Sequence, residues 1–97
     1  MSRHHMRPIH PGEILREEYL SPLEMSANQL AGHLGVPANR ISGIVNGGRA
    51  VTADTALRLG KYFGTSPEFW LNLQMAFELR TAEAETDLRA VKRMKAG

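Results

Sequence analysis

The stretch ANQLAGHLGVPANRISGIV, residues 27–45, decides the fold of this 97-residue chain. Its apolar residues recur at intervals of three and four on both sides of Gly35, which predicts two short helices joined by a tight turn. Ala31 is small where these two helices cross, and Gly35 lies where the chain needs a positive φ. Ile41 and Ile44 hold the second helix against the core, so its remaining positions, which are mostly short or polar, face outward.

Helical signals continue on both sides of this stretch. Ser26, Thr52 and Ser66 each occupy an N-cap position, and Gln29 completes a capping box with Ser26. Pro22 is expected to stop the first helix before it. No segment alternates apolar and polar residues, so we expect no sheet. The sequence predicts an all-α fold with an arm (1–10), a five-helix domain (11–80) and a helical tail (81–97), the five helices opening at Pro11, Ser26, Pro37, Thr52 and Ser66.

Composition narrows the class of protein. Apolar residues make up 42% and charged residues 23% of the chain, as in a globular domain. The chain has no cysteine, which excludes disulfide scaffolds and thiolate metal sites. No apolar run is long enough for a membrane span, and the first residues lack the apolar core of a signal peptide. We therefore expect a cytoplasmic protein with no membrane partner.

Charge is distributed unevenly along the chain, although its net value is only +2. No carboxylate occurs between Glu24 and Asp54, whereas His33, Arg40 and Arg49 lie in that interval. A surface without negative charge can approach a polyanion without repulsion. Two helices with a glycine turn form a helix-turn-helix, and this motif together with the missing carboxylates favours DNA binding.

Two long stretches, HPGEILREEYLSPLEMSANQLAGHLGVPANRISGIVNGGR (10–49) and TADTALRLGKYFGTSPEFWLNLQ (52–74), resemble the HigA/VapI-type antitoxins of the lambda-repressor-like helix-turn-helix class. The resemblance covers roughly residues 9–80. It implies a lambda-repressor-like five-helix DNA-binding fold that acts as a homodimer on double-stranded operator DNA. It also implies a RelE/HigB-type toxin partner, which is an mRNA-cleaving nuclease, and repression of the protein's own operon. A stand-alone transcriptional regulator of the same fold is the alternative.

In this fold the second helix of the motif enters the major groove. Arg40 is the best candidate for a two-donor contact to guanine, and Asn39 can read adenine. The start of the helix at 27–34 offers free N–H groups to a phosphate. The predicted base-facing residues are Ala38, Asn39, Arg40, Ser42 and Gly43, and the predicted phosphate contacts are Ala27, Asn28, Asn46 and Arg49.

The last helix of the domain carries a separate prediction. Eight of the eleven residues from Phe69 to Leu79 are apolar, more than one buried face needs. A second copy of the chain is the simplest partner for the remainder, with Trp70, Leu73 and Phe77 at the dimer interface. The alternative is that this helix is central and that the 81–96 segment covers its outer side.

The sequence gives little support to an enzymatic or a metal-dependent function. His4, His5 and His10 lie in the arm and His33 lies on a helix, with no adjacent serine and aspartate to complete a nucleophilic set. The Gly47-Gly48 pair lacks the lysine of a phosphate loop. A metal site at the three arm histidines is conceivable, but neighbouring histidines in a loose arm more often bind nothing. We expect no enzyme activity, no cofactor and no metal.

Overall fold

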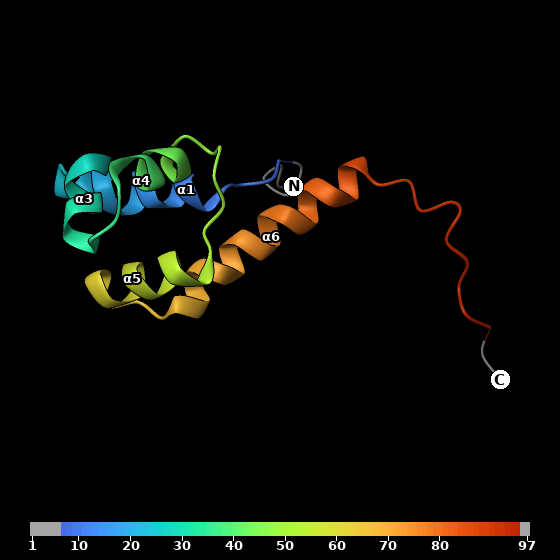
Figure 1. Cartoon of the computed structure of the whole chain (residues 1–97). Helices are drawn as coiled ribbons and strands as arrows, with labels where there is room; N and C mark the ends of the chain where they lie inside the picture. Colours follow the sequence, from blue (N-terminus) through green and yellow to red (C-terminus); the bar gives the residue numbers. More distant parts are fainter. Residues whose placement is uncertain (1–6, 96–97) are drawn as a thin grey trace.

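The part of the chain that the structure describes folds into five helices, in agreement with the all-α fold expected from its sequence. The computed structural model describes residues 7–95, and none of these forms a strand (Figure 1). The first helix is a rod of three consecutive pieces, and four separate helices follow it. The rod consists of α1 (Pro11–Ile14), the π-helical η2 (Leu15–Leu20) and α2 (Ser21–Leu23); the others are α3 (Ala27–Leu34), α4 (Ala38–Val45), α5 (Ala53–Phe63) and α6 (Pro67–Glu85).

The rod continues through Pro22, so the prediction that it stops before this proline is wrong. The π-helical turn before the proline is the reason. The N–H of Ser21 donates to the carbonyl of Arg16, five residues back, so the turn preceding Pro22 is wider than an α-turn. The wider turn reduces the clash between a proline ring and the preceding carbonyls that normally breaks a helix. The rod ends at Glu24, which has a φ of 53°.

α3, the turn and α4 follow the predicted capping pattern. The Ser26 hydroxyl accepts from the N–H of Gln29 at 3.0 Å, and the Gln29 side chain accepts from the N–H of Ser26 at 2.8 Å. Gly35 has a φ of 72°, and the N–H of Val36 closes the turn on the carbonyl of Ala31 at 3.1 Å. These local bonds confirm the predicted helix-turn-helix.

Trp70 lies at the centre of the core, so its prediction as a dimer-interface residue is wrong. Its side chain is fully buried within one chain, and its indole N–H donates to the Thr65 hydroxyl at 2.8 Å. The rings of Tyr19 and Phe63 pack beside it, with centroids 5.2 and 6.4 Å from its own. The other fully or nearly fully buried apolar residues are Leu15, Leu20, Leu30, Ala31, Leu34, Ile41, Ile44, Val51, Ala56 and Leu59.

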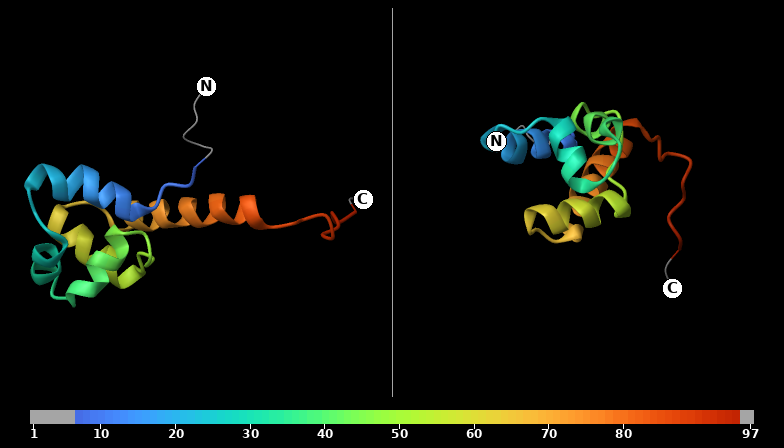
Figure 2. Two further views of the ribbon diagram at one scale, coloured as in Figure 1. Left: turned by 90° about the horizontal axis from the view of Figure 1, so that it is seen from above. Right: turned by 60° about the vertical axis from the view of Figure 1, so that its left-hand side comes forward.

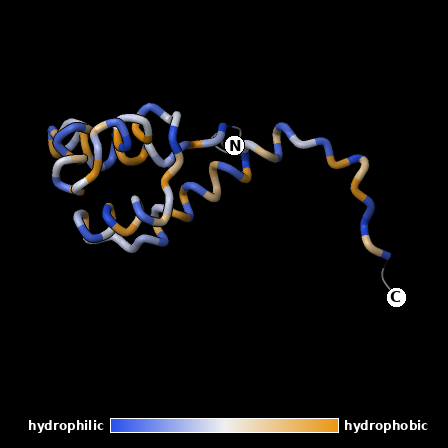
Figure 3. Tube along the Cα trace, in the orientation of Figure 1, coloured by the Kyte–Doolittle hydropathy of each residue, from blue (hydrophilic) through white to orange (hydrophobic). Residues whose placement is uncertain are grey.

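α6 is the longest helix, and its C-terminal half runs beyond the bundle (Figures 1 and 2). The prediction of a helical tail is correct for residues 81–85, which extend α6, and wrong for residues 86–95, which form no helix. Thr86 is extended, and the carboxylate of Asp87 accepts from the backbone N–H of Arg89, a local bond that competes with helix. Apolar residues continue into this segment but have nothing to pack against (Figure 3): Leu88, Val91 and Met94 are exposed.

Candidate nucleic-acid interface

The outer face of α4 is polar, small and exposed. Ile41 and Ile44 are fully buried on its inner face, which turns Ala38, Asn39 and Ser42 to solvent. Pro37 caps the helix in an extended conformation, as a short turn before a helix requires. Three of the five predicted base-facing residues therefore share one accessible surface.

The beginning of α3, the helix packed against α4, carries free backbone donors. The capping box binds the N–H of Gln29 but leaves those of Ala27 and Asn28 without an acceptor inside the helix. Asn28 is exposed, and Ala27 is half-buried against the core. This helix end has the partial positive charge and the free donors that an anion needs.

The loop after α4 folds back onto Gly43. The carbonyl of Gly43 accepts from the N–H groups of Gly48 and Arg49 at 2.9 and 3.1 Å, and the side-chain oxygen of Asn46 accepts from the N–H of Gly48 at 3.1 Å. Gly47, with a φ of 84°, completes the turn. Of the predicted phosphate contacts, Asn46 therefore keeps only its side-chain NH₂ group as a free donor.

The stem of Arg49 covers Gly43. A Cβ atom built on Gly43 would lie 3.3 Å from the Cβ of Arg49 and 3.7 Å from its Cδ. Gly43 is half-buried, and the stem of Arg49 occupies the space beside it, so Gly43 offers a base less surface than the exposed residues of α4. Arg49 itself is exposed.

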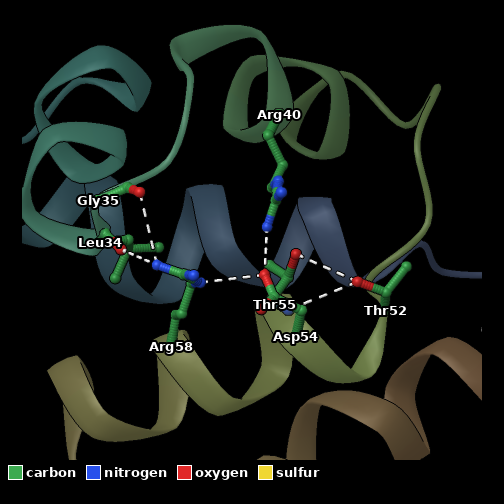
Figure 4. A network of polar contacts seen from close by, with 7 residues as sticks. All are labelled: Leu34, Gly35, Arg40, Thr52, Asp54, Thr55 and Arg58. Atoms are coloured by element: carbon green, nitrogen blue, oxygen red, sulfur yellow. Dashed lines mark hydrogen bonds and ion pairs between the residues drawn. The ribbon is translucent and has the colours of Figure 1, made fainter.

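Arg40 is half-exposed, but its guanidinium is paired with a carboxylate. Its guanidinium donates to Oδ2 of Asp54 in the first turn of α5, and the same oxygen accepts from Nε of Arg58 at 3.0 Å (Figure 4). Arg58 also donates to the carbonyl of Leu34 at 2.8 Å, at the end of α3. Hydrogen bonds from Arg40 and, to a smaller extent, from Arg58 hold the pKa of Asp54 below its ordinary value. Asp54 and Arg58 were missed from the sequence, because a contact between side chains fourteen residues apart has no local pattern.

His10 and Gly12 were also missed as structural residues. Nδ1 of His10 accepts from the N–H of Gly12 at 2.8 Å and so caps α1. A Cβ atom on Gly12 would lie 1.7 Å from the carbonyl oxygen of Ile44, so α1 meets the end of α4 at a point where only glycine fits. Burial lowers the pKa of His10, and the nearby backbone carbonyl of Arg49 opposes this shift. The His-Pro-Gly sequence before a helix was the available signal.

Leu73 and Phe77, the other two predicted dimer residues, are half-buried. Leu73 packs against the core, and the ring of Phe77 meets the ring of His10 edge to face with centroids 4.8 Å apart. The exposed apolar residues of α6 are instead Phe69, Met75 and Leu79, which are 37%, 61% and 50% exposed.

His4 and His5 lie outside the described residues, so the structure does not address the conceivable metal site in the arm. Within residues 7–95, no group of three histidine, aspartate or glutamate side chains could hold a metal ion. None of the helices in that range has the length and apolar content to cross a membrane.

Comparison with known proteins identifies the family. A family model described as helix-turn-helix matches residues 15–70. The chain is 53% identical to virulence-associated protein I of Dichelobacter nodosus over 83 residues, which span 86% of this chain and 77% of that protein. It is 42% identical to antitoxin HigA-1 of Vibrio cholerae over 73 residues, which span 75% of this chain and 69% of that protein.

Solved structures agree with these relatives. The Pseudomonas aeruginosa antitoxin HigA with the higBA promoter is similar with a TM-score of 0.79 and 51% identity, covering 80% of this chain and 85% of that one. Antitoxin GraA in complex with its operator is similar with a TM-score of 0.88 and 47% identity, covering 99% of this chain and 100% of that one. Sequence and structure together show that the chain belongs to the HigA/VapI-type antitoxins of the helix-turn-helix family.

Proposed function

We propose that this chain is an antitoxin that binds its operator as a homodimer, represses its own operon and neutralises a RelE/HigB-type mRNA-cleaving toxin. The outer face of α4 carries the DNA-binding part of this proposal. Its residues are exposed, small and uncharged, and α3, which packs against α4, begins with free N–H groups. An α-helix with such a face fits the major groove. Solved relatives with the same fold are complexes with an operator or promoter.

The exposed residues of α4 are the first candidates for contacts to the bases. Asn39 can donate to and accept from adenine, Ser42 can bond to a base edge, and Ala38 can contact a thymine methyl. Arg40 can reach guanine only after its guanidinium leaves Asp54. Gly43 is left out of this set because Arg49 covers it.

Phosphate contacts hold the helix in the groove. The N–H groups of Ala27 and Asn28 face one strand, and the charged end of Arg49 and the amide of Asn46 approach the backbone from the loop after α4. Neutralising phosphates in this way releases counterions, so we expect binding to weaken steeply with salt.

Dimerisation uses the exposed side of α6 in this proposal. Phe69, Met75 and Leu79 would be covered by a second copy, and the half-buried Leu73 and Phe77 would lie at the edge of the contact. Trp70 supports the interface from inside the chain by holding α6 to the core. A two-fold axis here presents two copies of α4 to successive major grooves, with half-site centres roughly 34 Å apart.

Footprinting on the DNA upstream of the chain's own coding sequence tests the operator. We expect protection of an inverted repeat with two half-sites, and weaker protection as salt rises. Saturating protection of one isolated half-site would contradict the two-fold geometry, and no protection would contradict operator binding itself.

The toxin partner is tested separately. We expect the neighbouring reading frame to encode a toxin whose growth arrest is relieved when this chain is co-expressed, and the two proteins to purify together. One observation favours the alternative of a stand-alone regulator: the chain is 45% identical over 83 residues to the Escherichia coli protein named HTH-type transcriptional regulator YbaQ. Operator binding without any toxin that the chain neutralises would support that alternative.

A further inference from the structure

Two arginines from different helices meet on one carboxylate beside the proposed DNA-binding face. Arg40 comes from the first turn of α4 and Arg58 from the middle of α5, and both donate to Oδ2 of Asp54 (Figure 4). Arg58 is held in turn by the carbonyl of Leu34 at 2.8 Å. Arg58 is therefore anchored to the end of α3 and holds Asp54 on α5, and Arg40 is the partner that reaches across from α4.

The position of this carboxylate in the sequence makes its negative charge exceptional in this part of the chain. Residues 25–53 contain no aspartate or glutamate, and Asp54 is the first acidic residue after that interval. It therefore places a negative charge at the border of a surface that is otherwise neutral or positive, and it occupies one of the two arginines, Arg40 and Arg49, within the interval.

The ion pair between Asp54 and Arg40 is exposed enough for Arg40 to exchange one acceptor for another. The side chain of Asp54 is 55% exposed and that of Arg40 is 31% exposed, so solvent reaches both partners. Ion pairs at such positions are weak, and a phosphate or a guanine edge offers the guanidinium an alternative acceptor. A buried pair would not permit this exchange, because breaking it would leave an unpaired charge away from water.

We propose that Asp54 is an affinity-limiting residue, which competes with DNA for the guanidinium of Arg40. This inference rests on the proposed function as an operator-binding protein. In the free protein Arg40 is engaged by Asp54, and DNA must displace the carboxylate before Arg40 contributes to binding. The carboxylate also repels the approaching phosphates. Both effects lower the affinity for DNA, so the residue at position 54 sets how tightly this protein holds its operator.

The opposite role, in which Asp54 orients Arg40 for contact with DNA, predicts the opposite result. If Asp54 positioned Arg40, its removal would leave the arginine free to adopt several conformations and would weaken operator binding. If Asp54 competes for Arg40, its removal strengthens binding. The sign of the change separates the two roles.

The test is a double-mutant cycle of Asp54→Asn and Arg40→Gln, measured on the operator and on random DNA of equal length. Asp54→Asn should raise operator affinity about three- to tenfold and should also raise the affinity for random DNA. In the Arg40→Gln background, most of that gain should disappear, because no guanidinium remains to be released. Glu83→Gln is the control: it removes the same charge from the Arg80 pair near the end of α6 and should change affinity less than about twofold.

A thermal unfolding curve for each variant checks that the helices are intact, since Asp54 also lies in the first turn of α5. If Asp54→Asn unfolds the chain, Asp54→Ser, which also favours a helix start, replaces it in the cycle. Unchanged or weaker operator binding by the folded variant overturns the inference, as does a gain that persists fully without Arg40. Failure of the wild-type chain to bind any operator would instead overturn the proposed function.

Discussion

α3 and α4 differ from α6 in how their conformation is determined. In α3 and α4, caps, the Gly35 turn and buried isoleucines all lie within about twenty residues of one another. In α6 the first turns are fixed by the core around Trp70, but the second half extends into solvent with Met75 and Leu79 exposed. The helix-turn-helix is therefore complete within one chain, whereas α6 carries exposed apolar side chains that a second chain would cover.

The largest expected effect lies where the rod meets α4. Gly12→Ala places a Cβ atom 1.7 Å from the carbonyl oxygen of Ile44, and a backbone atom cannot move aside without displacing α4. We expect a loss of more than about 3 kcal/mol in the free energy of unfolding, measured in urea. Gly32→Ala is the matched control. A Cβ there meets nothing within 4 Å, so it should stabilise the chain by about 0.5–1 kcal/mol. Equal effects of the two substitutions would show that α4 is not seated on Gly12.

The double variant Met75→Glu, Leu79→Glu tests whether α6 needs a second chain. Both side chains are exposed in one chain, so the variant should stay helical but become monomeric in sedimentation. A monomer binds only one half-site at a time, so operator affinity should fall by about a hundredfold or more. Leu57→Glu is the control, since Leu57 is 60% exposed on α5 and should leave the dimer unchanged. A variant that remains dimeric would move the interface away from this side of α6.

Arg49→Ala tests the loop between α4 and α5. Its charged end is placed for the DNA backbone and not for a base, so affinity for the operator and for random DNA should fall together by about three- to tenfold. The slope of log affinity against log salt should become shallower by about one for each half-site. Loss of affinity on the operator alone would instead assign Arg49 to base reading. Because its stem packs on Gly43, a thermal unfolding curve should accompany the measurement.

The smallest expected effect comes from His10, which caps α1 through the Gly12 N–H and packs against Phe77 of α6. Burial lowers the pKa of His10, so the folded state binds a proton less readily than the unfolded state. Its contribution to stability is therefore complete above about pH 6.5 and is lost as the pH falls below that value toward the lowered pKa. His10→Asn keeps an acceptor for the Gly12 N–H but cannot titrate. Its unfolding free energy should change less than that of the wild type between about pH 7.5 and 5.5.

Local signals made most of the fold predictable. The capping box at Ser26, the positive φ at Gly35 and the helix starts at Thr52 and Ser66 each depend on residues within a single turn. Pro22 was misjudged because a π-turn has no recognised local pattern in the sequence. The tail was misjudged because its apolar spacing resembles a helix, although nothing in residues 7–95 covers it.

The candidate site was less predictable than the fold. Ala38, Asn39 and Ser42 follow from the helical phase set by Ile41 and Ile44. Whether Arg40 and Gly43 are accessible to DNA depends on Asp54 and Arg49, whose contacts arise only after α5 and the loop are packed. Trp70 was misplaced because the apolar composition of α6 shows only that much of the helix surface is buried. The composition does not show which rings face the core of the same chain and which face a partner.

The π-turn in the rod also determines how the length of the chain can vary. Leu15 and Leu20 are both buried and are five residues apart, so this segment contains one residue more than an α-turn needs to bring two leucines to one face. Removing one of the exposed residues between them, Glu17 or Glu18, would place the leucines at the ordinary spacing of four. Both would still face the core, and the seat of Gly12 on Ile44 would be undisturbed. A deletion of one residue can thus be absorbed inside a helix, where it usually does the most damage, without changing how α4 is presented.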